Sequence, residues 1–379
     1  MNPQNVLKEI LSKQQPFECP FQVLELQARL VKILGGVLKG IISLSDSEML
    51  STILNMTYQH FSRKNCDYET SLMCRTLYTD VAITMSCCHL LRKPSNTSED
   101  DFQSIFNAIQ GLDRAIVFAG VPDRLDLVHE LIETLQRQYL IPKSATNEYL
   151  LENATRGRQQ HGPTSTPVPQ VHLQGLFPSD LSTPFVIPGA ISDWPAISDP
   201  DHAWNSIDYL LGVAGPGRIV PVEIGNDYRA DNWSQKMMLW EDFLHWLRTS
   251  DGVRKEEMVY LAQHSLLTQF PKLRDDILIP DLVYFVPETR EADYKPPANA
   301  EGFIINAWLG PKGTISPAHK VRFHHFPSSN VQRFSSHQDP YFNCYGKLLA
   351  PGTEYQQLIF GSPGCRLQEC MAGSTKLFG

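Results

Sequence analysis

Residues 303–319 read F-I-I-N-A-W-L-G-P-K-G-T-I-S-P-A-H, and residues 337–345 read H-Q-D-P-Y-F-N-C-Y. The first run is β-branched and aromatic up to Trp308, and turn residues at 310–313 follow it. The strand pattern resumes at 314–316, so we expect a β-hairpin that ends on a histidine. This pattern predicts that the second half of the chain is built from short antiparallel strands.

The H-Q-D sequence is the candidate metal site. His337 and Asp339 are two residues apart, so both side chains project from the same face if the segment is extended. Two imidazole nitrogens and one carboxylate on one face of Fe(II) form the facial triad of non-haem iron oxygenases. An H-x-D pair alone is a weak signal, and its weight depends on the sequence around it.

Six segments of the second half, taken in order, resemble the JmjC-domain 2-oxoglutarate oxygenases, and within that family the lysine demethylase 8 and arginyl hydroxylase group. The matching segments are F-V-I-P-G-A-I-S-D-W-P (185–195), V-P-V-E-I-G (220–225), Y-L-A-Q-H (260–264), I-N-A-W-L-G-P (305–311), T-I-S-P-A-H (314–319) and H-Q-D-P (337–340). Several independent motifs in the family's order make a chance similarity unconvincing.

The resemblance implies a fold and an activity. The fold is α+β, with a helical N-terminal region followed by a double-stranded β-helix of the cupin or jelly-roll type. The activity is an Fe(II)- and 2-oxoglutarate-dependent dioxygenase that hydroxylates or demethylates Arg or Lys side chains of a protein or peptide substrate. The sequence leaves open which of these two side chains and which of the two reactions apply.

The resemblance also implies the site residues. His337 and Asp339 match the metal ligands. The far carboxylate of 2-oxoglutarate needs hydrogen-bond donors, because a desolvated carboxylate without them is costly. The matching positions are Tyr260, Ser316 and Asn343. Trp308 matches a position near the substrate pocket, although a core tryptophan is an equal reading.

The chain departs from the family pattern between its two metal motifs. In the family one histidine ends T-I-S-P-x-H and also starts H-Q-D-P, whereas here His319 and His337 are separate. Residues 319–336 therefore read as an insertion. Either His337 pairs locally with Asp339, which needs no loop closure and is favoured, or His319 keeps the ligand position.

A second departure concerns the C-terminus. The family's third ligand is a histidine downstream of H-x-D, and no histidine follows His337 in this chain. Residues 348–379 lack the expected strand pattern, so we expect an incomplete barrel. The chain's own enzymatic activity is therefore left open. The alternative function is a catalytically inactive isoform that acts at most as a protein-binding module.

Composition narrows the functional classes and the cellular locations that fit the chain. The chain has 379 residues, 42% of them hydrophobic, and a formal charge of -8. That acidity argues against general binding to a nucleic-acid backbone. Eight cysteines without a signal-peptide pattern predict mostly reduced, buried thiols. The most apolar run, 30–44, is too short to span a membrane. We expect a nuclear or cytoplasmic protein.

Domain boundaries follow from composition and periodicity. Residues 1–152 read as a helical domain with a possible protein-docking role, 153–169 as a linker, and 170–379 as the cupin-like domain. The helical domain includes a capping box expected at 45–48, before a stripe of Met49, Ile53 and Met56. In the second half, strands are expected at 185–188 and 218–224 and a helix face at 240–247. His264 reads as a hydrogen-bonded structural histidine, and Glu223 is assigned no chemistry.

Overall fold

A computed structural model describes ten stretches of the chain, namely residues 2–14, 21–41, 43–92, 99–140, 191–225, 233–249, 258–279, 304–310, 343–348 and 355–361. These belong to two compact units. The first unit comprises Met1–Ala145 together with Ala214–Val220, and the second comprises Thr146–Val213 with Pro221–Gly379. The linker predicted at 153–169 lies outside the described residues, and the predicted boundaries at 152 and 170 stay predictions.

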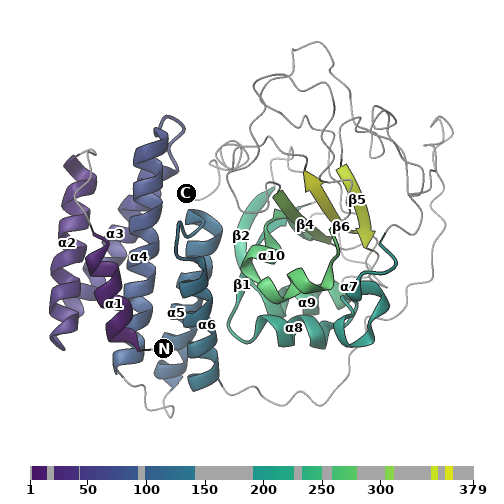
Figure 1. Cartoon of the computed structure of the whole chain (residues 1–379), viewed down its shortest axis with the longest axis horizontal. Helices are drawn as coiled ribbons and strands as arrows, with labels where there is room; N and C mark the ends of the chain where they lie inside the picture. Colours follow the sequence, from purple (N-terminus) through teal and green to yellow (C-terminus); the bar gives the residue numbers. More distant parts are fainter. Residues whose placement is uncertain are drawn as a thin grey trace. The chain divides into compact units, whose positions relative to one another are not determined.

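The first unit is helical, as the apolar periodicity predicts. Figure 1 shows its long helices with their axes roughly aligned, and α4 contacts α3 and α5. The helices are α1 (Pro3–Ser12), α2 (Phe21–Leu38), α3 (Leu44–Phe61), α4 (Tyr68–Arg92), α5 (Glu99–Arg114), the π-helical turn η1 (Ala115–Ala119) and α6 (Leu125–Tyr139). Their apolar stripes meet in one continuous core.

Two local predictions for α3 differ from the structure by a few residues. The capping box was expected at residues 45–48, but the structure places the N-cap at Ser43, whose side chain accepts from the Asp46 backbone N–H. Asp46 in turn accepts from the Ser43 backbone N–H, which completes the reciprocal pair. Ile53 of the expected stripe is fully buried, whereas Met56 is 37% exposed. The buried face of α3 therefore runs through Leu50, Ile53 and Thr57.

The second half combines short helices with strands. The helices are α7 (Pro195–Ser198), η3 (Pro200–His202), α8 (Ile207–Ala214), α9 (Trp240–Thr249), α10 (Leu266–Gln269) and η5 (Pro271–Asp276). The strands are β1 (Ile219–Ile224), β2 (Ser234–Leu239), β3 (Val259–His264), β4 (Ile304–Gly310), β5 (Asn343–Leu348) and β6 (Tyr355–Gly361). The expected strand at 218–224 and the expected helix face at 240–247 are confirmed as β1 and α9.

The strands form one sheet in the order β2-β1-β3-β4-β6-β5, and the pairs from β1 onward are antiparallel. The predicted α+β architecture, helices first and then antiparallel strands, is confirmed. The prediction that no strand follows residue 348 was wrong, because β6 pairs with β4 along one edge and with β5 along the other. The second arm of the expected hairpin, residues 314–316, lies outside the described residues, and the described strands next to β4 are β3 and β6.

The two faces of the central strands differ in chemistry. Successive strand residues alternate between faces, and cross-strand partners share one. Val222, Leu261 and Leu309 lie on one face and are at most 5% exposed. The pairing of Glu223 with Tyr260 puts these two residues on the opposite face. One face of the sheet is thus an apolar core, and the other carries polar and aromatic groups.

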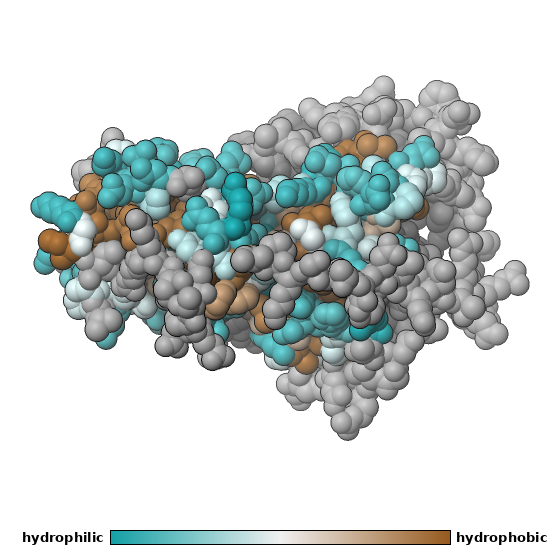
Figure 2. All heavy atoms as spheres, turned by 90° about the horizontal axis from the view of Figure 1, so that it is seen from below, coloured by the Kyte–Doolittle hydropathy of each residue, from teal (hydrophilic) through white to brown (hydrophobic). Residues whose placement is uncertain are grey.

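The surface of the described residues is mixed. The face drawn in Figure 2 shows hydrophobic areas broken up by hydrophilic ones. The large hydrophobic side chains that are exposed lie on separate helices or in loops, namely Ile41, Met56, Tyr68, Phe102, Ile197 and Leu278. In the part of the chain that the structure describes, no helix has the length and apolarity needed to span a membrane. Of the eight cysteines, Cys74, Cys87 and Cys88 are buried thiols, as expected.

Candidate functional site

Three of the predicted site residues lie in described strands. Tyr260 is in β3, Trp308 is in β4, and Asn343 is the first residue of β5. The other predicted residues, Ser316, His319, His337 and Asp339, lie outside the described residues. The structure therefore bears on the surroundings of the expected metal and cosubstrate sites, and the ligand assignments stay predictions.

Tyr260 and Trp308 project from the same face of the sheet. Leu261 pairs with Leu309 on the apolar face, so their neighbours Tyr260 and Trp308 point to the opposite face. Tyr260 is 8% exposed, and Trp308 is half-buried. Asn343 is linked to the same sheet through its backbone register, because it pairs with Gly361, and Gly361 pairs with Ile304 at the start of β4. The three positions thus share one sheet, and the two described side chains share one face.

Glu223 of β1 joins this face, and sequence reasoning gave it no role. Its carboxylate accepts hydrogen bonds from Trp233 Nε1 and Gln235 Nε2, each at 3.3 Å. Burial raises the pKa of the Glu223 carboxyl above its usual value, and the two hydrogen bonds offset part of that rise. Among the described residues no Lys or Arg forms an ion pair with Glu223. The face therefore holds a partly buried carboxylate whose hydrogen-bond partners are neutral.

An irregularity at the end of β3 shapes the neighbouring part of the site. The register shifts between Leu261 and His264, and Gln263 has a φ of 50°, which is rare for a residue with a side chain. His264 Nε2 lies 2.6 Å from Gln269 Oε1, so the structural role expected for this histidine is confirmed. Ser265 donates to Asn306 Oδ1 at 3.1 Å and fixes the strand after the bulge to β4.

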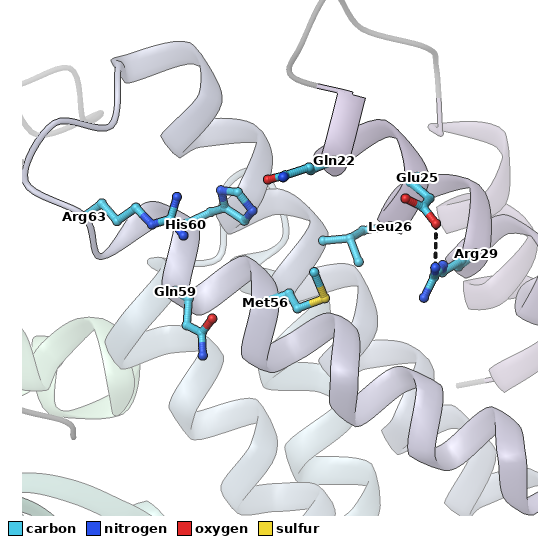
Figure 3. A pocket seen from close by; sticks show the side chains of 8 residues that line it. All are labelled: Gln22, Glu25, Leu26, Arg29, Met56, Gln59, His60 and Arg63. Atoms are coloured by element: carbon cyan, nitrogen blue, oxygen red, sulfur yellow. Dashed lines mark hydrogen bonds and ion pairs between the residues drawn. The ribbon is translucent and has the colours of Figure 1, made fainter.

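A cavity of about 390 Å³ lies elsewhere, in the first unit between α2 and α3. Figure 3 shows its lining, with the Glu25–Arg29 ion pair at one end and His60 and Arg63 at the other. It includes no predicted site residue. Among the described residues, no three His, Cys, Asp or Glu side chains lie close enough to hold a metal ion. The candidate site is therefore the polar face of the sheet rather than this cavity.

The polar groups on that face suit two different kinds of ligand, an anion and a cation. The Tyr260 hydroxyl can donate to a carboxylate, and it fits the predicted contact with 2-oxoglutarate. The Glu223 carboxylate, in contrast, would repel an anionic ligand. A buried carboxylate is costly without a cation, and Trp233, Tyr260 and Trp308 supply aromatic surfaces that favour one. The sequence held one clue to this role, since V-P-V-E-I puts a charged residue inside an otherwise apolar strand.

The chain is similar to known proteins. The family model described as "Cupin-like domain" matches residues 179–347. "Lysine-specific demethylase 8" of Danio rerio is 40% identical over 44% of this chain and 38% of its own length. "Lysine-specific demethylase JMJ30" of Arabidopsis thaliana is 38% identical over 39% of this chain and 29% of its own length. "Jumonji C domain-containing protein 5" of Drosophila melanogaster is 30% identical over 69% of this chain.

The antiparallel sheet and the family match define the second half of the chain as a cupin-like domain that follows a helical region. The names of these relatives, two demethylases and one Jumonji C protein, agree with the similarity of this chain to the JmjC-domain oxygenase family. The chain spans 38%, 29% and 59% of the length of the three relatives described above. The resemblance noted in the sequence is confirmed.

Proposed function

We propose that this protein is an Fe(II)- and 2-oxoglutarate-dependent dioxygenase that hydroxylates an arginine side chain of a nuclear or cytoplasmic protein. The similarity to the JmjC-domain oxygenase family and the demethylase names of two relatives support an oxygenase acting on protein substrates. The observation that carries the choice of side chain is the Glu223 carboxylate. It is partly buried, makes no ion pair among the described residues, and lies on the face that also carries Tyr260 and Trp308.

Arginine fits this carboxylate better than a trimethylated lysine does. A guanidinium presents two parallel N–H donors, which match the two oxygens of one carboxylate. A trimethylammonium group carries charge but has no N–H to donate, so it would leave both oxygens without a strong partner. The hydrogen bonds that Glu223 now accepts are long, at 3.3 Å, and a guanidinium would replace or supplement them. Trp308 would lie beside the alkyl part of the substrate side chain.

The reacting groups follow from the resemblance. His337 or His319, together with Asp339, would hold the metal, and Tyr260, Ser316 and Asn343 would hold the far carboxylate of the cosubstrate. When bound, Fe(II) and 2-oxoglutarate supply the oxidising chemistry, in which O2 is divided between succinate, formed with release of CO2, and the hydroxylated side chain. The described residues would orient the substrates: Glu223 would bind the cationic end of the peptide side chain, and the Tyr260 hydroxyl would donate to the cosubstrate carboxylate.

The test is turnover of matched peptides by the purified full chain with Fe(II), ascorbate and 2-oxoglutarate. We expect succinate and a peptide that gains one oxygen atom when arginine is present. The same peptide with citrulline, which keeps the shape but loses the charge, should give no oxygenated product. A trimethyl-lysine peptide distinguishes demethylation. Absence of succinate with the full chain and with a variant lacking residues 319–336 would exclude the proposed activity.

The alternative is an inactive isoform that binds partners. Its motivation is the lack of any histidine after His337, which removes the family's third metal ligand from the sequence. Calorimetric titration with Mn(II), a redox-stable substitute for Fe(II), separates the two functions. The oxygenase requires one-to-one binding that Asp339→Ala abolishes, whereas the inactive isoform shows no saturable binding in either protein.

A further inference from the structure

The segment immediately before β1 is held by side chains of α5 and α6, within the first unit. The Asp113 carboxylate is fully buried and accepts from Arg218 Nε at 3.0 and 3.1 Å and from Arg218 Nη2 at 2.8 Å. The same carboxylate accepts from the Ile219 backbone N–H at 2.9 Å. Asp113 and Arg218 are 105 residues apart in sequence. One side chain of α5 thus fixes both the arginine before β1 and the first backbone donor of β1.

A second contact fixes the turn that precedes Arg218. Gln136 Nε2 of α6 donates to Ala214 O at 3.1 Å and to Pro216 O at 2.8 Å. Gly217 has a φ of +82°, and a Cβ there would lie 2.7 Å from the Phe106 ring. Only glycine combines this backbone conformation with so close an approach. We call Asp113, Gln136 and the segment 214–219 together the β1 clasp.

The strand held by the β1 clasp is the one that carries Glu223. β1 starts at Ile219 and continues to Ile224, and its Glu223 pairs with Tyr260 of β3. An extended strand has little freedom to shift along its length, since a slip of one residue would move Glu223 to the apolar face. The position of the carboxylate therefore depends on where the start of β1 is fixed.

We propose that Asp113 and Gln136 are positioning residues for the cation-binding face, and that the β1 clasp sets the register in which β1 presents Glu223. The consequence of this positioning for substrate binding rests on the proposed function. Neither residue lies on that face, and both act through the strand. Loss of Asp113 would remove the charged acceptor of a buried guanidinium, whose hydrogen bond to Ala214 O is longer at 3.4 Å, and the acceptor of the Ile219 N–H.

A second buried ion pair in the first unit provides a matched control. Asp80 Oδ1 lies 3.2 Å from Arg124 Nε, and the two side chains are 1% and 7% exposed, against 0% and 5% for Asp113 and Arg218. This pair joins α4 to the residue before α6, and the Asp80 carboxylate accepts from Gln14 and Arg124 rather than from segment 214–220. A general loss of helical stability would follow from either pair, whereas a change confined to β1 would follow only from Asp113.

The experiment is amide hydrogen exchange of residues 219–224 in the full chain, without metal or substrate. Asp113→Asn and Asp80→Asn are compared, because each keeps the side-chain volume. We expect Asp113→Asn to accelerate exchange in β1 by about tenfold or more relative to Asp80→Asn, since it removes a charge-assisted network. Equal exchange of β1 in the two variants would overturn the proposal.

A glycine pair keeps the test informative if Asp113→Asn fails to fold. Gly217→Ala introduces the clash with Phe106, whereas Gly212→Ala in α8 adds a Cβ with nothing within 4 Å. Faster exchange in β1 for Gly217→Ala alone supports the β1 clasp, and equal exchange contradicts it. Titration of the arginine peptide then separates the two proposals. If β1 responds but the wild-type chain binds no arginine peptide, the β1 clasp stands and the proposed function fails.

Discussion

The Glu223 carboxylate lowers the stability of the unliganded protein and is proposed to bind a cationic substrate. Its carboxyl has a pKa raised by burial, so in the folded protein the neutral form is favoured over a wider pH range than in the unfolded chain. The contribution of this group to stability is thus present below its unfolded pKa and is lost as pH rises through the folded pKa. A cationic substrate reverses this cost, because its charge compensates the buried carboxylate.

We therefore expect Glu223→Gln to have opposite effects on stability and on binding. At neutral pH the unliganded variant should melt at a higher temperature than the wild type, while its affinity for an arginine peptide should fall by about tenfold or more. The wild-type affinity should increase as pH rises through the raised pKa, and the variant should lack that step. Glu241→Gln on the exposed surface of α9 is the control. Similar changes in Glu223→Gln and Glu241→Gln would contradict the assignment.

Tyr260 is expected to act on the cosubstrate rather than on the peptide. Tyr260→Phe keeps the ring, which is 8% exposed, and removes only the hydroxyl. Loss of one hydrogen bond to a charged group costs about 1.5–3 kcal/mol, so KM for 2-oxoglutarate should rise by about tenfold or more. KM for the peptide should change little. Steady-state kinetics with each substrate varied in turn measure both values, and an effect confined to the peptide would refute this role.

At the scale of elements, the start of α3 shows which of two nearby serines is the N-cap. Ser43 and Ser45 are both serines near an acidic residue, but only Ser43 accepts from the backbone N–H at the third helical position. Ser43→Ala should lower the free energy of unfolding by about 1 kcal/mol, and Ser45→Ala should have a smaller effect. Urea denaturation followed by circular dichroism measures the difference. The reverse order would restore the capping box that the sequence suggested.

A carboxylate network ties three short elements of the second unit together. Asp276, at the end of η5, is fully buried and accepts from Trp204 Nε1 at 2.7 Å and from the Tyr209 hydroxyl of α8 at 2.6 Å. His202 of η3 places its Nδ1 2.7 Å from the same carboxylate. This hydrogen bond raises the pKa of the His202 imidazole above its usual value. The network contains no predicted site residue, and we expect it to govern stability.

Its pH dependence has a definite sign. Because the folded pKa of His202 is raised, its stabilising contribution is complete below the unfolded pKa of about 6.5 and is lost as pH rises through the folded pKa. His202→Ala should remove this part of the pH dependence of unfolding. His245→Ala, at an exposed histidine of α9, should leave it in place. Chemical denaturation of the variants across neutral pH checks this, and parallel profiles for wild type and His202→Ala would disprove it.

At the scale of the whole molecule, β6 holds the C-terminal strands to the sheet. It pairs with β4 from Ile304↔Gly361 to Gly310↔Tyr355, and its other edge pairs with β5. A chain that ends at residue 350 would lose β6 and expose the edge of β4, and an open apolar edge promotes aggregation. We expect that chain to scatter light and melt at a lower temperature than one ending at residue 365. Equal solubility would show that β6 is dispensable.

The sequence by itself determined the class of fold and the helical half. The apolar spacing that predicts the helix face at 240–247 is set by residues a few positions apart, and those residues lie on one face of α9. The ordered motifs from 185 to 340 indicated the resemblance to a family, since the order of motifs along a chain does not depend on packing. The strand β6 was missed because its sequence, Y-Q-Q-L-I-F-G, has little alternation, and its pairing with two neighbours outweighs that weak local preference.

Only the tertiary structure decided the environment of the candidate site. Sequence could propose Tyr260 and Trp308, but the shared face depends on a strand register with a shift at Gln263. The charged Glu223 gained its meaning from the neutral partners Trp233 and Gln235. The β1 clasp joins Asp113 to Arg218 across 105 residues. Such contacts depend on how the elements pack, and local sequence patterns carry no record of packing between distant segments.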